Sequence, residues 1–415
     1  MKRHSRRSLT MIAVAALAAT VTACGSGGSG SGGGGSDKLT FLSWSGQEVM
    51  GPVVKDFEAK HPDIDVEISY APPVAEYIQA LQTRVLSGTA PDVFVIAAEN
   101  KTNLIGGGHV VDLSGEPWMS TIPEFNKKTY GKGGAVYGAS PSSWGAGIAY
   151  NKELLAKVGV DTVPATWEEF LQLCRKLQDA GIKPYMEDLS QMPTILSSFV
   201  GAQNAAEDFT MDKKIFDGTS SFEKEWTGPL TEYNKLYAEG LADKNAVGLT
   251  ADQVFDEFAN GRVAMITSGP WNVAPLKKAA PDMQFSIAPV PAAPGGKPFL
   301  AGAASPGYAI NAKSDNTAQA KTFLQYLVSR EGVEKFQKLS NDITVTTDYQ
   351  PALDPSLKAI VKDVRAGNVY LPMIAWTRSE DVLNVEAVAQ IQQLVKGTVT
   401  PQEAAAALDR KLASS

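Results

Sequence analysis

The sequence predicts an α/β protein of two lobes, each built on a mostly parallel sheet flanked by helices. Its 415 residues exceed the size at which a single hydrophobic core usually stops growing, about 250–300 residues. Short apolar strands alternate with amphipathic helices, which is the pattern of a parallel sheet covered on both faces. The alternation begins near residue 38 and starts again after Tyr150, so we expect two α/β units in series.

The first unit is predicted to hold three strands joined by two helices. Residues 38–43, 64–68 and 91–96 are short apolar or alternating runs, as expected of strands. Residues 49–60 and 77–86 carry apolar side chains at helical spacing. In open sheets of this kind, ligands bind beyond the carboxyl ends of the strands. The candidates there are Trp44, after the first strand, and Glu99 and Asn100, after the third.

The second unit is predicted from a further series of the same elements. Residues 183–186 and 263–266 are apolar runs that indicate strands. Asp188 and Trp271 follow these two runs, where a ligand-facing side chain is expected. The last strong helical patterns are residues 313–329 and 385–396.

The N-terminus is typical of an exported chain. Residues 1–7 are strongly basic and residues 9–19 are apolar, which predicts a secretory signal. The run ends in VTAC, which resembles the bacterial lipobox, so residues 1–23 are predicted to be a lipoprotein signal peptide and Cys24 the lipidated residue. Residues 24–36 are almost entirely Gly and Ser, a flexible tether with a reach of about 20 Å. The alternative is an ordinary signal peptide with an incidental cysteine.

The composition argues against several classes of function. The net charge is −7, so a nucleic-acid partner is not expected. Two Cys and three His predict neither a metal cluster nor a disulfide framework. The chain carries no nucleophile elbow or phosphate-binding loop. We therefore expect no cofactor, no metal and no catalytic residue.

Five segments, in this order, resemble recurring blocks of one protein family. They are residues 87–93 (SGTAPDV), 136–138 leading to 150–154 (VYG and YNKEL), 164–170 (PATWEEF), 258–265 (FANGRVAM) and 268–271 (SGPW). On these blocks the chain resembles the extracellular solute-binding proteins of carbohydrate-uptake ABC importers, the maltose-binding-protein-like family 1. The resemblance covers nearly the whole chain after the tether.

The resemblance implies a type II periplasmic-binding-protein-like fold, with two lobes that close on a ligand like a hinged clamp. It implies a di- or oligosaccharide as ligand, the importer's permease as partner, a monomer, and a location on the extracellular face of the membrane through a lipid at Cys24. By analogy the N-terminal lobe comprises residues 37–142 and 303–340, and the C-terminal lobe residues 143–302 and 341–415.

A sugar site needs aromatic platforms flanked by carboxylates, amides and an arginine. Trp271 matches a sugar-stacking aromatic of the family, and Trp376 resembles another. Where other members carry a carboxylate in the first crossing between lobes, this chain has PSSW at 141–144. The predicted ligand-binding residues are Trp44, Glu99, Asn100, Ser142, Trp144, Asp188, Trp271, Gly302, Trp376 and Arg378.

Each candidate also has a structural reading. Any of the tryptophans can be a packing residue, as we expect of Trp118, Trp167 and Trp226. Ser142 and Trp144 can brace the hinge, Gly302 can be a flexible hinge, and the polar residues can belong to solvated loops.

Two other functions remain open from the sequence. The same fold could bind a non-sugar solute such as a polyamine, given the acidic surface. A secreted glycosidase would need two carboxylates about 5–5.5 or 6.5–9.5 Å apart. We expect a binding protein and not an enzyme.

Overall fold

The structure is a computed structural model, and it describes residues 37–97, 100–340 and 342–415. The predicted signal peptide, the tether and Cys24 lie outside these residues, as does Glu99. Among the described residues, no helix has the length and apolar character needed to cross a membrane.

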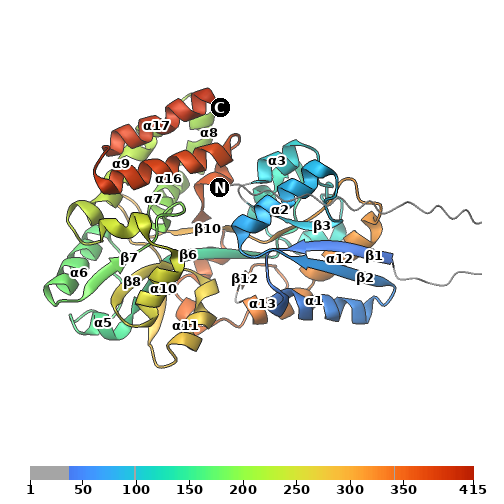
Figure 1. Cartoon of the computed structure of the whole chain (residues 1–415), viewed down its shortest axis with the longest axis horizontal. Helices are drawn as coiled ribbons and strands as arrows, with labels where there is room; N and C mark the ends of the chain where they lie inside the picture. Colours follow the sequence, from blue (N-terminus) through green and yellow to red (C-terminus); the bar gives the residue numbers. More distant parts are fainter. Residues whose placement is uncertain (1–36, 98–99, 341) are drawn as a thin grey trace, which may run out of the picture. The chain divides into compact units, whose positions relative to one another are not determined.

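The first sheet has four strands in the order β11-β3-β1-β2. Figure 1 labels three of them, β1, β2 and β3. β1 is parallel to both β2 and β3, and β11 runs against β3. These strands are β1 (Asp37–Ser43), β2 (Ile64–Tyr70), β3 (Val93–Ile96) and β11 (Gly307–Ile310). Its helices are α1 (Gln47–Lys60), α2 (Val74–Ser87), α3 (Lys101–Gly106), α4 (Glu124–Thr129), α12 (Thr317–Val328) and α13 (Arg330–Ser340).

Helix α1 shows why these residues form this layer. Its buried side chains, Met50, Val53, Val54 and Phe57, recur at the spacing that places them on one helical face. Helix α2 ends at Gly88, whose φ of 73° is the left-handed conformation that glycine adopts most readily. The predicted positions of both helices are therefore confirmed to within a turn.

The second sheet has the strand order β13-β10-β6-β8-β7, with β9 and β12 also paired to β6. β7 is parallel to β8, and β13 to β10, but the long β6 runs against its neighbours β8 and β10. The second sheet is therefore mixed and not mostly parallel as predicted, because β6 runs against β8, β9, β10 and β12. The strands are β6 (Ser142–Asn151), β7 (Lys183–Met186), β8 (Val263–Ser268), β9 (Phe285–Ala288), β10 (Leu300–Ala304), β12 (Ile343–Thr344) and β13 (Val369–Tyr370).

Helices surround the second sheet. They are α5 (Lys152–Ala156), α6 (Trp167–Asp179), α7 (Thr194–Ala206), α8 (Met211–Phe216), α9 (Phe222–Ala238), α10 (Ala251–Ala259), α11 (Val273–Ala279), α14 (Val361–Arg365), α15 (Pro372–Ala375), α16 (Glu380–Lys396) and α17 (Pro401–Ser414). Short elements complete the chain: β4 (Gly131–Lys132), β5 (Ala135–Val136), and the 3-10 turns η2 (Pro117–Thr121), η3 (Lys244–Gly248), η4 (Pro270–Asn272) and η5 (Pro355–Leu357).

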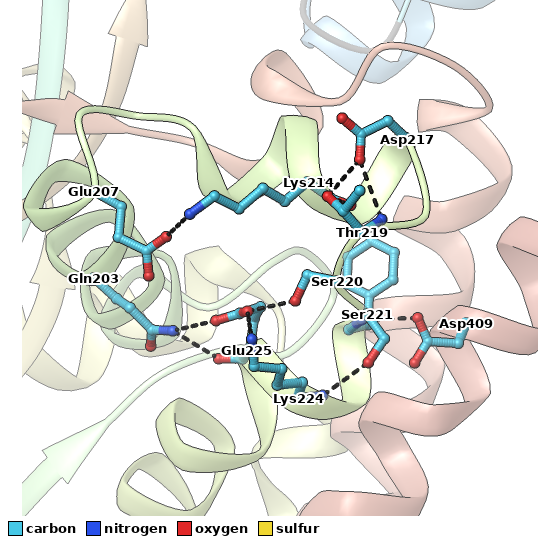
Figure 2. A network of polar contacts seen from close by, with 11 residues as sticks. Gln203, Glu207, Lys214, Asp217, Thr219, Ser220, Ser221, Lys224, Glu225 and Asp409 are labelled. Atoms are coloured by element: carbon cyan, nitrogen blue, oxygen red, sulfur yellow. Dashed lines mark hydrogen bonds and ion pairs between the residues drawn. The ribbon is translucent and has the colours of Figure 1, made fainter.

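The C-terminal helix is fixed to this layer by a carboxylate. Figure 2 shows Asp409 of α17 near the start of α9. Its carboxylate accepts hydrogen bonds from the main-chain N–H groups of Phe222 (2.7 Å) and Glu223 (2.8 Å). The first N–H groups of a helix lack partners within the helix, so this carboxylate satisfies two of them. Ser221 caps the same helix locally, through Lys224 N–H.

The hydrophobic cores follow the two sheets. One cluster of buried side chains draws on residues 39–139 and 304–336, which include all four strands of the first sheet. Two further clusters draw on residues 148–300 and 343–412 around the second sheet. The chain thus has separate cores joined by the segments that pass between them at β6, β10 and β12.

Candidate functional site

The ends of several strands lie at one edge of the second sheet. β7 and β8 are parallel, so their carboxyl ends lie together, and β6 runs against β8, so its first residues lie at the same edge. β10 runs against β6 and is parallel to β13, so both end at this edge as well. The register pairs Met186 with Ile266, Gly147 with Ser268, Gly145 with Gly302, and Ala301 with Tyr370.

Two of the predicted tryptophans meet at this edge. Trp271 lies in η4 directly after β8, and Trp144 lies near the start of β6. Their ring centroids are 5.5 Å apart with the planes at 79°, an edge-to-face contact. The Trp271 side chain is 47% exposed although it is a large apolar ring. The structure therefore brings these two predicted residues together and leaves one of them accessible.

The turn that carries Trp271 explains its position. A Cβ atom at Gly269 would overlap the Trp271 ring, so the ring folds back over the glycine. The Asn272 amide donates a hydrogen bond to the Ser268 hydroxyl at 3.1 Å, which closes the turn. The sequence SGPW thus fixes the ring at the sheet edge and not in the core.

Gly302 and Ser142 lie on the strands that cross between the cores and help to hold these strands in place. A Cβ atom at Gly302 would overlap the Trp144 carbonyl oxygen, so the glycine allows β10 to approach β6 closely. Ser142 is fully buried, and its carbonyl accepts hydrogen bonds from the Asn126 amide (2.9 Å) and from Ser305 N–H (3.0 Å). Both residues brace the crossing, and their predicted ligand contacts stay predictions.

Asp188 follows β7 at the same edge as Trp271. It is partly exposed, and one carboxylate oxygen accepts a hydrogen bond from Ser190 N–H at 3.3 Å. The neighbouring Glu187 is buried and accepts hydrogen bonds from the Tyr233 and Tyr237 hydroxyls at 2.6 Å each. Burial raises the pKa of Glu187 to about 7, and the tyrosine hydroxyls oppose that rise.

The hydrogen bonds from Tyr233 and Tyr237 to Glu187 were not predicted from the sequence. Tyr233 and Tyr237 are four residues apart on α9, so they lie on one helical face. That spacing was a visible signal, but the sequence alone does not tell which carboxylate the face meets.

The first sheet presents two predicted residues at the carboxyl ends of its parallel strands. Trp44 follows β1 and makes an edge-to-face contact with Tyr77, with centroids 5.4 Å apart. Asn100 is 1% exposed, and its side-chain oxygen accepts a hydrogen bond from Ala97 N–H at 3.0 Å. Its amide nitrogen has no partner within the described part of the chain. An unpaired buried amide is costly, which marks this position as a candidate for ligand contact.

Trp376 lies in the core and not at the edge. It is 1% exposed and packs against Phe222, Trp226 and Phe216, with centroids 5.8, 6.1 and 6.4 Å away. The short helix α15 turns the chain after β13, so that the ring enters the space between α8 and α9. The predicted ligand contact at Trp376 has no support in this arrangement. Arg378, two residues later, is exposed.

Two surface hollows lie elsewhere. One is lined mainly by residues 181–185 and 240–244, and the other by residues 114–120 and 131–136. Neither contains a predicted ligand-binding residue. The register and the exposed ring at the sheet edge therefore define the candidate site better than these hollows do.

Comparison with known proteins identifies the family. A sequence model described as bacterial extracellular solute-binding protein matches residues 42–334. The chain belongs to this family. The family resemblance predicted from the five sequence blocks is thereby confirmed, and the family is one of binding proteins.

Individual relatives are more distant. The multiple sugar-binding protein of Streptococcus mutans is 23% identical over 338 residues, which is 79% of this chain and 79% of that protein. The melibiose/raffinose/stachyose-binding protein MelE of Bacillus subtilis is 22% identical over 374 residues, 86% of this chain and 83% of that protein.

Solved structures confirm the fold class. A family 1 extracellular solute-binding protein from Bifidobacterium longum subsp. infantis matches with a TM-score of 0.79 and 32% identity, covering 92% of this chain and 100% of that one. The binding protein RafE in complex with raffinose matches with a TM-score of 0.75 and 20% identity, covering 90% of this chain and 98% of that one. The fold is therefore the two-lobed, type II periplasmic-binding-protein-like fold.

Proposed function

We propose that the protein captures a di- or oligosaccharide between its lobes and delivers it to the permease of an ABC importer. The observation that carries this proposal is the half-exposed Trp271 ring, held against Trp144 at the edge of the second sheet where β8 ends and β6 begins.

The chemistry of this edge suits a sugar. Pyranose rings offer flat C–H patches to aromatic faces and hydroxyl groups at their rims. Trp271 supplies the aromatic face, and Asp188 lies at the same edge as an acceptor for hydroxyl groups. Asn100 adds, on the first lobe, an amide donor that has no partner among the described residues. Trp44 and Arg378 are further candidate contacts, and the predicted contact at Glu99 lies outside the described residues.

The similar proteins support a carbohydrate ligand without identifying it. Their names include sugar-binding, raffinose-binding and maltodextrin-binding proteins, and one similar structure is a chitin oligosaccharide binding protein. The sugars in these names differ, and none of the four proteins is above 25% identity to this chain. They therefore favour the class of ligand and not one member of it.

The proposed mechanism is closure of the two lobes on the sugar. Each lobe supplies part of the sugar contacts. A sugar that contacts both lobes binds the closed form more tightly than the open form, and this difference in affinity favours closure. The lobes proposed are residues 37–142 with 303–340, and residues 143–302 with 341–415. The permease then recognises the closed form.

Calorimetry with a sugar panel tests this function. Raffinose, a maltodextrin, a xylan oligosaccharide and a chitin oligosaccharide are titrated into the protein, with spermidine as the amine comparison. We expect one sugar class to bind and to raise the unfolding temperature, because a ligand at 100 times its Kd stabilises the folded state by about 2.7 kcal/mol. Binding of spermidine alone, or turnover of a sugar, would overturn the proposal.

The membrane anchor is a separate part of the proposal. A lipid on Cys24, followed by the Gly/Ser tether, would hold the binding lobes within about 20 Å of the extracellular face of the cell membrane. Replacement of Cys24 by Ser should release the protein from the membrane fraction into the medium. A Cys24→Ser protein that stays in the membrane fraction would contradict the anchor but leave the sugar site untouched.

A further inference from the structure

Two hydrogen bonds join the lobes away from the crossing strands. The Lys101 ammonium donates to the main-chain oxygen of Ile374 at 2.5 Å. The next residue, Thr102, donates its main-chain N–H to a carboxylate oxygen of Glu380 at 3.1 Å. Each contact spans more than 270 residues of sequence, and neither involves β6, β10 or β12.

The partners belong to different hydrophobic cores. Lys101 and Thr102 begin α3, whose Leu104 and Ile105 are buried in the core of the first sheet. Glu380 begins α16, whose Leu383 is buried in the core of the second sheet. The two hydrogen bonds therefore connect elements that are otherwise anchored in separate lobes.

Both charges in this contact are shielded from water. Glu380 is 2% exposed, which is rare for a carboxylate unless it is paired. Lys101 is partly buried, and its desolvation lowers its pKa to about 8, while the charge of Glu380 opposes the fall. The charge of Glu380 therefore favours the protonated form of the lysine.

The contact lies on the ligand side of both lobes. Lys101 directly follows Asn100, which is at the carboxyl end of β3. Ile374 lies in α15, which follows β13 at the edge that carries Trp271. Closure of the lobes on a sugar would bring these two segments together.

We propose that Lys101 and Glu380 form a clasp that holds the lobes in the closed arrangement through direct contact between them, in addition to contacts through the sugar. The clasp deepens the proposed clamp mechanism and depends on it for its biological role. Its contacts involve only protein atoms, so they can be tested without knowing the ligand.

Each of the two side chains bonds to the main chain of the other lobe, Lys101 to the Ile374 oxygen and Glu380 to Thr102 N–H, and the two charges also attract each other across the contact. Water solvates both charges when the lobes separate, and this offsets much of the attraction that the closed form gains. Removal of one charge leaves the other shielded from water without that attraction, which disfavours closure. Removal of both charges eliminates that penalty, so the double variant should be closer to wild type than either single variant.

Hydrogen exchange measured by mass spectrometry tests the clasp in sugar-free protein. The variants are Lys101→Met, Glu380→Gln and their combination. Exposed residues without a side-chain partner in the described chain serve as controls, in the variants Lys55→Met and Glu153→Gln. We expect each single clasp variant to raise amide exchange by about tenfold in both residues 101–106 and residues 374–383, with a smaller change in the double variant.

The outcomes separate the clasp from the sugar-binding function. Unchanged exchange in the two single variants, or a change confined to the lobe that carries the substitution, would overturn the clasp. If a single variant does not fold, Glu380→Gln and Glu380→Ala are compared, because glutamine keeps an acceptor for Thr102 N–H and alanine does not. Faster exchange in both segments would support the clasp even if every sugar in the panel failed to bind.

Discussion

The two tryptophan pairs of the second lobe differ in where they lie. Trp144 and Trp271 meet edge to face at the end of the sheet, and Trp271 is about half exposed. Trp226 and Trp376 are fully buried with centroids 6.1 Å apart, and neither indole N–H has a partner within the described residues. Trp271 and Trp376 both come soon after a strand that ends at the same edge.

The difference shows that the position after a strand does not by itself make a residue ligand-facing. The turn at Gly269 and Pro270 keeps Trp271 at the sheet edge. The short helix α15 instead carries Trp376 under α8 and α9. The local conformation of the few residues after the strand therefore decides whether a ring joins the core or the surface.

Truncation of the buried ring should have the largest effect on stability. We expect Trp376→Ala to lower the free energy of unfolding by about 3–5 kcal/mol, because it opens a large cavity among aromatic side chains. Urea denaturation followed by circular dichroism measures the change, and Trp376→Phe should cost less. If Trp376→Ala kept wild-type stability but abolished sugar binding, the ring would belong to the site after all.

A pH series tests the buried carboxylate of Glu187, which follows β7. Folding raises the pKa of Glu187 from 4.5 to about 7, so the folded state binds its proton more tightly than the unfolded state. The stability that this proton supplies is complete below pH 4.5 and is lost as the pH rises to about 7. Relative to Glu187→Gln, the wild-type protein should lose up to roughly 3 kcal/mol across this range.

The comparison with Glu187→Gln also controls for other buried groups that titrate in this pH range. Asp212 is also buried, and desolvation raises its pKa to about 6, so it titrates in the same range. It is present in both proteins, and its contribution cancels in the difference. Parallel curves of stability against pH for the two proteins would show that Glu187 keeps an ordinary pKa when folded.

Truncation of the exposed ring should affect binding and not stability. We expect Trp271→Ala to weaken the affinity for the bound sugar by more than tenfold, about 1.4 kcal/mol, because the stacking face is lost. Calorimetry measures the affinity, and the unfolding midpoint should stay close to that of the wild-type protein. Gly269→Ala is a matched test, since its added Cβ must displace the Trp271 ring without removing it. Unchanged affinity in both variants would contradict the site assignment.

The sequence was informative where structure depends on neighbouring residues. The three parallel strands of the first sheet and the helix at residues 49–60 were predicted because apolar spacing and turn signals are local. The burial of Trp376 was not predicted because it depends on α8 and α9, which precede it by about 140 to 160 residues. The Lys101 contact with Ile374 was missed for the same reason, since no local pattern links residues 273 positions apart.

Substitution of Arg378 should have the smallest effect on sugar affinity. This residue follows Trp376 by two residues, is exposed, and forms no salt bridge in the described part of the chain. If its guanidinium reaches the sugar, Arg378→Ala should weaken binding by about threefold, since one solvated hydrogen bond contributes roughly 0.5–1 kcal/mol. Arg378→Lys should retain part of that affinity, because the charge remains but the planar fork is lost. Calorimetry with the same sugar measures both variants. If Arg378→Ala kept the wild-type affinity, the segment after β13 would contribute to the core and the clasp but not to sugar binding. Trp271 would then remain the aromatic platform of this lobe.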